Sequence, residues 1–254
     1  MDHLLAIPEP GTTALLVLIM FASAVLQTTT GFGFAILSAP VLTAVFGGPE
    51  AVSTIIICGT AVDVLILLVR RTGSRRAAPR EVAVLVLSSV PGLVLGAWLL
   101  SVLPQRALLL VVAAAVVLAV AHRVLQRRAP RASRPVSWGW GAAAGFASGT
   151  LGTSTTLAGP PTVLYLTRRL SDPSSIRDTL VAVNLVRAPI SVAALLAAGT
   201  FAVPAGIVWP ALAACAGYLL GSRLFGRLDA ARYESLVLSA LVLAAAVAVA
   251  SAFL

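Results

Sequence analysis

Apolar runs of about 20 residues alternate with short arginine-rich segments along the chain. A run of this length is what an α-helix needs to cross the hydrocarbon core of a bilayer. Six runs predict ordinary membrane-spanning helices, which are Glu50–Val69, Val82–Val102, Arg106–Ala121, Ile176–Ala198, Val203–Leu220 and Tyr233–Leu254. The hydrophobic pattern therefore predicts an all-α polytopic membrane protein.

Two further apolar stretches, Gly11–Phe46 and Ser137–Leu166, are too long for one span. Each is interrupted in its middle by Gly, Ser, Thr or Pro residues, at Thr28–Gly33 in the first and at Gly149–Thr156 in the second. We therefore expect each stretch to form a broken or re-entrant helical hairpin, or two short spans.

The composition agrees with a membrane protein. Of 254 residues 59% are hydrophobic and only 11% are charged, whereas soluble domains carry about 25% charged residues. The net charge of +9 would otherwise suggest a nucleic-acid binder, but in a membrane protein its meaning depends on where the charges lie. We expect membrane lipids as partners and no nucleic acid.

Arginines predict the sidedness of the loops, because positive charge accumulates on the cytoplasmic side. Four segments between apolar runs hold 16 of the 18 arginines. If these segments are cytoplasmic, each broken stretch enters and leaves on one side, and the two halves have opposite orientations. The prediction is two inverted-topology repeats, 1–122 and 137–254, each a hairpin plus three transmembrane helices, joined by a basic cytoplasmic linker at 123–136. Both termini are then outside the cell membrane.

A short sequence match supports the repeat. Gly31 aligns with Gly152 and Pro40 with Pro161 at one common offset, so the spacing from Gly to Pro is nine in both halves. The identity is thin, and it supports the repeat only in combination with the charge-derived topology.

The two breaks are candidates for an anion site. Irregular backbone at membrane depth must be buried in protein or line a cavity, and helices that start near Ala35 and Leu157 would point free N–H groups and positive dipole ends into the breaks. Candidate ligand-binding residues at the breaks are Thr30, Gly31, Phe32, Gly33, Gly152, Thr153, Ser154 and Thr155. The alternative is that small residues there only allow close helix packing.

Two ionisable side chains lie well inside predicted spans. Asp63 and Arg187 are each fourteen residues after a proline, Pro49 and Pro173, so they occupy equivalent positions of the two halves. Charges inside a membrane are costly and indicate function by default. Arg187 could bind an oxyanion through two N–H groups, and Asp63 could carry a proton or balance Arg187. A purely structural pair, or snorkelling of Asp63 to the interface, is the alternative.

Other chemistry is sparse. Asn184 lies three residues before Arg187 on the same helical face, where it either lines the same cavity or bonds to a neighbouring helix, and Gln27 beside the first break has the same two interpretations. Neither the P-loop spacing nor HExxH occurs, and no cluster of carboxylate, His or Cys residues suggests a metal. We expect no cofactor, no metal and no enzymatic activity.

The segments TTTGFGFAILSAPVL (28–42) and ASGTLGTSTTLAGPPTVLYL (147–166) resemble the paired signatures of the sulfite exporter TauE/SafE family. Gly31, Gly33 and Pro40 match the first signature, and Gly152 and Pro161 match the second. Many members have a Gly-rich run where this chain has 153–156, which leaves the particular substrate open.

The resemblance implies a bacterial inner-membrane permease that moves small sulfur-containing anions such as sulfite, sulfonates or sulfoacetate by secondary transport. We expect alternating access around an anion held between the breaks, with Arg187 as charge partner. Coupling to protons through Asp63 and assembly as a homodimer are further hypotheses. The alternative is a passive channel for anions or small neutral solutes that uses the same hairpins as a filter.

Overall fold

The computed structural model describes residues 10–69, 77–104 and 137–227, together with isolated residues after 104 and after 227. Within these ranges every regular element is a helix. The helices are α2 (Pro10–Thr30), α3 (Phe34–Phe46), α4 (Gly48–Leu68), α5 (Pro79–Val102), α7 (Trp138–Thr155), α8 (Gly159–Arg169), α9 (Pro173–Ala197) and α10 (Val208–Phe225). Five of them, α2, α4, α5, α9 and α10, are long and apolar enough to cross a membrane.

Four of the six predicted spans correspond to described helices. The bounds of α4, α5 and α9 agree with the prediction to within three residues, whereas α10 begins five residues later than the predicted Val203. The delay has a local cause, because Pro204 disfavours helical backbone at the residue before it and Gly206 has a positive φ of 74°. The other two predicted spans and the basic linker lie outside the described residues.

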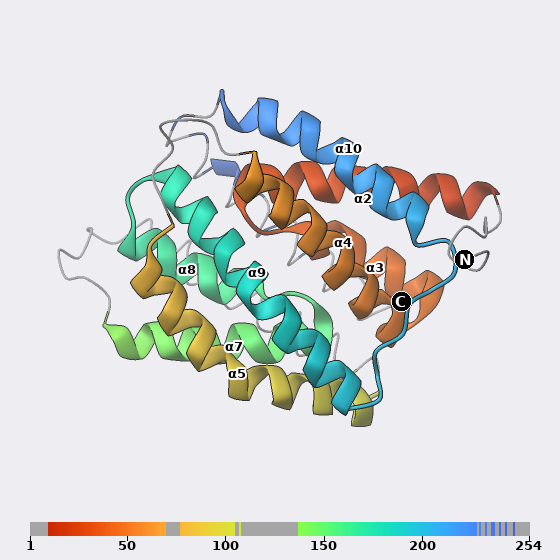
Figure 1. Ribbon diagram of the computed structural model, residues 1–254, viewed down its shortest axis with the longest axis horizontal. Coiled ribbons are helices and arrows are strands. Elements are labelled where there is room, and N and C mark those ends of the chain that lie inside the picture. The colour runs from red at the N-terminus through yellow and green to blue at the C-terminus, as the bar shows by residue number, and fades with distance from the viewer. Residues whose placement is uncertain are drawn as a thin grey trace.

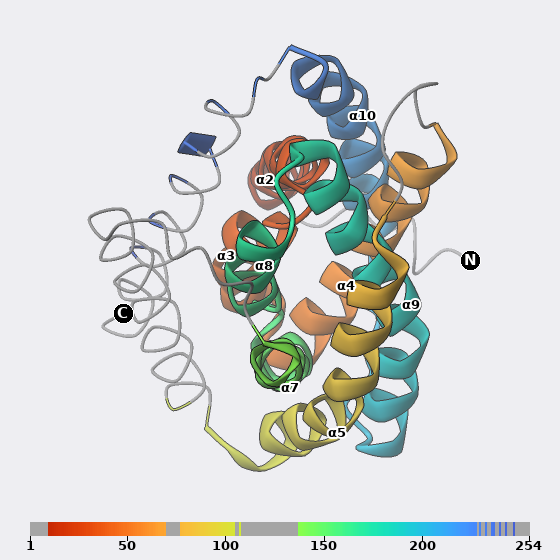
Figure 2. The ribbon, with the colours of Figure 1, turned by 90° about the vertical axis from the view of Figure 1, so that its left-hand side faces the viewer.

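The described helices form two layers (Figures 1 and 2). The first layer contains α2 and α7 with the two short helices α3 and α8 between them, towards opposite ends of the molecule, and the second contains α10, α4, α9 and α5. Each helix of the second layer packs on one of the first, with α5 on α7 and α10 on α2 making the most extensive contacts. The two breaks therefore face each other at the centre, beneath α4 and α9.

Glycine pairs allow the closest of these contacts. A Cβ atom added to Gly92 or Gly96 of α5 would collide with backbone carbonyl oxygens of α7, and Gly149 of α7 has the same relation to α5. On α10, a Cβ added to Gly217 would collide with the carbonyl oxygen of Phe21 of α2, and one added to Gly221 would lie 2.7 Å from the Cβ of Thr28. In a membrane, where lipid is as apolar as leucine, such small residues four apart allow the backbone approach that drives helix association.

The first break lies where the sequence predicts it, but the second lies further along the chain. α2 ends at Thr30 and α3 begins after Gly33, whereas α7 continues through Thr155. The predicted break at Gly149–Thr156 is therefore wrong, and the irregular residues are 156–158, with Thr156 in the left-handed region at φ 66°. Two prolines in the first turn of α8 favour a helix start at this position. The N–H groups of the first helical turn have no partner within the helix, so proline, which has no N–H, loses no hydrogen bond there.

Large apolar side chains cover the outward surface of the helices. Leu18, Leu68, Leu87 and Trp140 are each more than 60% exposed. A soluble protein rarely leaves contiguous apolar area of this kind uncovered, and lipid chains satisfy it without cost. The charged residues Asp63, Glu81, Arg177, Asp178 and Arg187 are instead buried.

Candidate functional site

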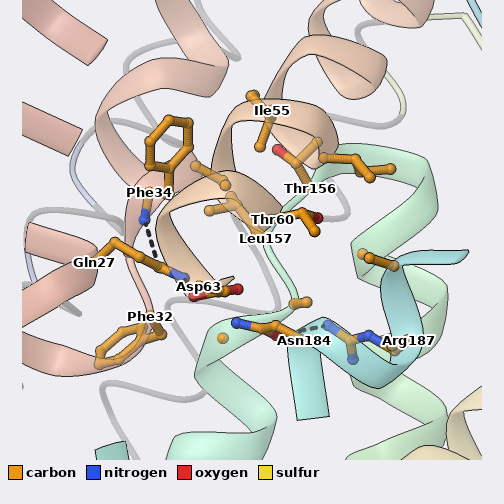
Figure 3. A pocket seen from close by; sticks show the side chains of 18 of the residues that line it. Gln27, Phe32, Phe34, Ile55, Thr60, Asp63, Thr156, Leu157, Asn184 and Arg187 are labelled. Atoms are coloured by element: carbon orange, nitrogen blue, oxygen red, sulfur yellow. Dashed lines mark hydrogen bonds between the residues drawn. The ribbon is translucent and has the colours of Figure 1, made fainter. Parts of the chain in front are cut away.

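A cavity of about 100 Å³ lies where the two breaks meet. Its walls come from six helices: the end of α2, the starts of α3 and α8, the end of α7, and the middles of α4 and α9. A ligand the size of a drug needs 300 Å³ or more, so this space suits several water molecules or an anion of a few heavy atoms. Most of the lining is apolar, and the longer polar side chains, Gln27, Asp63, Asn184 and Arg187, follow one another across it (Figure 3).

Arg187 is the only cation at the cavity among the residues that the structure describes. Its side chain is buried, and its guanidinium donates one hydrogen bond to Ser148 Oγ (Nη1, 2.7 Å) and one to Asn184 Oδ1 (Nη2, 3.2 Å). A guanidinium has five N–H donors, so three remain for a ligand. Ser148 in turn donates to the carbonyl oxygen of Ala158 at 2.6 Å, which ties the arginine to the second break.

Asp63 lies opposite, on α4. Its Oδ1 accepts a hydrogen bond from Gln27 Nε2 at 2.6 Å, and Gln27 Oε1 accepts one from the backbone N–H of Phe34 at 3.2 Å. Asp63 is therefore tied to the first break as Arg187 is tied to the second. Asn184 connects the two charges, because its amide oxygen faces Arg187 and its amide nitrogen points towards Asp63 (Figure 3). The two charges are not a direct ion pair.

Hydroxyl and backbone donors contribute less at the helix starts than the sequence suggests. The first N–H of α3, at Phe34, is already accepted by Gln27. At the start of α8, Pro160 and Pro161 have no N–H at all. Fewer N–H groups at the two helix starts are therefore available to a ligand than the sequence predicts, and Arg187 adds the N–H donors of a buried guanidinium.

The structure brings six of the predicted residues to the cavity and leaves five away from it. Lining residues are Phe32, Gly33, Asp63, Gly152, Asn184 and Arg187. The other five are Thr30, Gly31, Thr153, Ser154 and Thr155.

The hydroxyls among those five donate to backbone carbonyls, as in Thr30 to Leu26 at 2.8 Å and Ser154 to Thr150 at 2.7 Å. This geometry does not fit the prediction that they donate to an anion. Gly31 instead permits close packing, since its φ is +80° and an added Cβ would lie 2.8 Å from the carbonyl oxygen of Arg177. Gly152 lines the cavity, and a Cβ there would lie 3.2 Å from the Cβ of Ala158 and 3.8 Å from Nη2 of Arg187.

Several residues that line the cavity are not among those predicted from the sequence. Thr60 lies one turn before Asp63, and its hydroxyl makes no hydrogen bond to any residue that the structure describes. The segment 156–160 forms one wall, and the Pro-Pro pair at its end was the available signal for it. Gly159 faces Phe32 of the other break, where an added Cβ would come 2.6 Å from the ring.

A second buried polar cluster lies outside the cavity, where α5, α7 and α8 meet. Glu81 accepts a hydrogen bond from Tyr165 Oη at 2.5 Å and from Arg169 Nε at 3.0 Å. The guanidinium of Arg169 stacks on the ring of Trp138, 4.6 Å from its centroid. This cluster joins the arginine-rich end of α8 to its neighbours. In the described ranges, no three His, Cys, Asp or Glu residues lie close enough together to hold a metal ion.

Comparison with known families matches residues 15–248 to the model described as "Sulfite exporter TauE/SafE". The chain belongs to the sulfite exporter TauE/SafE family. The match covers both broken pairs and every described helix around the cavity. No curated protein and no solved structure matches the chain.

Membership confirms the resemblance seen in the two signature segments. TauE/SafE proteins are membrane transporters of sulfur-containing anions, so the chain is a multi-pass membrane protein of a transporter family. A small cavity with one buried arginine, enclosed by spanning helices, agrees with cargo of that charge and size.

Proposed function

We propose that this TauE/SafE protein is a permease that carries small sulfur-containing anions across the cell membrane, with the anion bound beside Arg187. The observation that carries the proposal is the buried guanidinium at the wall of the cavity, with three donors left over after its bonds to Ser148 and Asn184. A buried cation without a direct ion-pair partner is costly in a membrane, and an anionic ligand would offset that cost.

Helix lengths support a site near mid-membrane. α3 has 13 residues and α8 has 11, which at 1.5 Å per residue makes them about 20 and 16 Å long. Each runs from the cavity back to its own face of the membrane. Since the hydrocarbon core is about 30 Å thick, both breaks would lie near its middle, where transporters built from inverted repeats bind their substrates.

The inverted repeat is part of the proposal, and the helix bounds support it. The end of α7 and the starts of α8 and α9 each lie 125 residues after the corresponding bounds of α2, α3 and α4. The glycine pair 92 and 96 has its counterpart in 217 and 221 at the same offset. Under this register Gly31 corresponds to Thr156, both with positive φ. The predicted match of Gly31 with Gly152 is thus out of register by four residues, one helical turn. The predicted equivalence of Asp63 and Arg187, which lie 124 residues apart, is out of register by one residue.

Crossed hydrogen bonds support the same relation. The N–H of Ala78, just before α5, donates to Thr179 of α9 at 2.9 Å, and the N–H of Ala202, before α10, donates to Ser53 of α4 at 3.1 Å. α5 packs on α7 as α10 packs on α2, so each half covers the broken helix of the other. Rocking of one interlocked half against the other around the cavity would expose the anion alternately to the two sides.

The deciding experiment is flux of radiolabelled sulfite into proteoliposomes that contain the full chain. A permease should give saturable uptake and accelerated exchange when unlabelled sulfite is present inside. Flux that grows linearly with concentration, without exchange, would indicate the channel instead. If neither sulfite nor methanesulfonate moves under any imposed gradient, the proposed function fails.

A further inference from the structure

The orientation of two amides determines what Asp63 can do. Gln27 must turn its oxygen towards the N–H of Phe34, so its nitrogen faces Asp63 as a donor. The guanidinium of Arg187 is a donor only, so Asn184 turns its oxygen to it and its nitrogen towards Asp63. Both amides therefore present donors to this carboxyl group. This arrangement satisfies an ionised Asp63, which only accepts.

A protonated Asp63 has a different requirement, because its O–H must find an acceptor. Neither amide can accept from it without turning away from Phe34 or Arg187. The carboxyl group also lines the cavity, so an occupant of the cavity is placed to accept this bond. An oxygen atom of a bound oxyanion is such an acceptor.

Charge balance favours that protonation when an anion is bound. In the described ranges, Asp63 and Arg187 are the only ionisable residues that line the cavity. The other ionisable groups on helices packed around them lie away from it, and these are Glu50, Cys58, Arg80, Glu81, Tyr165, Arg168, Arg169, Arg177, Asp178, Cys215, Tyr218 and Arg223. An anion that pairs with Arg187 leaves the Asp63 carboxylate uncompensated beside a second negative charge. Buried groups in that situation take up a proton.

On the basis of the proposed function, we infer that each anion that binds beside Arg187 brings one proton onto Asp63, whose O–H then donates to the anion. The proton comes from water on the side to which the cavity is open and leaves when the anion leaves. The empty cavity holds one positive and one negative side chain, and the loaded cavity holds one positive side chain and one negative ligand. Its net charge is zero in both states. The substrate class is thus a singly charged sulfur oxyanion, such as hydrogen sulfite or a monosulfonate.

Isothermal titration calorimetry tests this inference on the full chain in detergent, with methanesulfonate as the probe. Methanesulfonate keeps a single charge at neutral and mildly acidic pH, so proton uptake cannot come from the ligand. Titrations at pH 7 in two buffers with different ionisation enthalpies give the number of protons per bound anion. We expect about one, with affinity rising about tenfold for each unit that the pH falls. Uptake near zero in the wild-type protein would overturn the inference.

Two variants localise the proton. Asp63→Asn keeps a neutral side chain of the same shape and should bind methanesulfonate with no proton uptake and no pH dependence. Glu81→Gln changes a buried carboxyl group outside the cavity and should keep the uptake of the wild type. Equal uptake in Asp63→Asn and wild type would assign the proton elsewhere and refute the inference. Failure of the wild type to bind either methanesulfonate or sulfite would remove the proposed function and the inference with it, whereas binding without proton uptake removes only the inference.

Discussion

Replacement of Arg187 by Gln tests the centre of the proposed site. Arg187 is 6% exposed, and its guanidinium has three N–H donors that no described residue occupies. A hydrogen bond to a charged group contributes about 1.5–3 kcal/mol, roughly twice the neutral value. If two such bonds to an anion are replaced by one neutral bond from Gln, the expected loss is about 2–4.5 kcal/mol, roughly a 30- to 1,500-fold increase in Kd at 1.4 kcal/mol per factor of ten.

Sulfite binding to the purified variant, measured by calorimetry or with labelled anion, checks this value. Arg177→Gln is the matched control, since Arg177 is a buried arginine on the same helix that pairs with Asp178 at 3.0 Å and does not line the cavity. The control should lose thermal stability and keep its affinity. Unchanged affinity in folded Arg187→Gln protein would refute the reasoning and move the anion to the helix starts at the breaks.

Three further predictions concern packing and access. Gly149→Ala should lower the free energy of unfolding by about 1–3 kcal/mol, because its Cβ would collide with a carbonyl oxygen of α5. Gly139→Ala in the same helix is the control: its Cβ would meet only one side-chain oxygen, at 3.7 Å, so this variant should unfold at the wild-type temperature or above it. Gly152→Ala should raise the KM for sulfite flux in proteoliposomes, because its methyl group narrows the cavity beside the guanidinium, and should lower the thermal midpoint slightly, because the methyl group also lies 3.2 Å from the Cβ of Ala158; an unchanged KM would contradict the assigned lining. Glu81→Ala should destabilise the protein by about 2 kcal/mol, since it removes the carboxylate that accepts hydrogen bonds from the Tyr165 hydroxyl and from Arg169. Its affinity for sulfite, measured at a temperature where the variant is fully folded, should stay unchanged.

The sequence by itself determined the class of protein and most of its helices. Apolar runs of spanning length identify α4, α5 and α9 because a bilayer imposes one length on every helix that crosses it. The same physics made the intramembrane charges conspicuous. Asp63 and Arg187 could be selected from the sequence because a charge at that depth has few explanations other than a partner or a ligand.

Only the tertiary structure decided which residues share the cavity. The hydroxyls at Thr30 and Ser154 have the right chemistry for an anion site, but each donates to a carbonyl one turn earlier, a choice that depends on helix geometry. Gln27 and Asn184 have two interpretations in sequence, and their orientation follows from neighbours on other helices. Local pattern fixes the length and polarity of a helix, whereas contacts between helices far apart in the chain fix which of its faces meets the ligand.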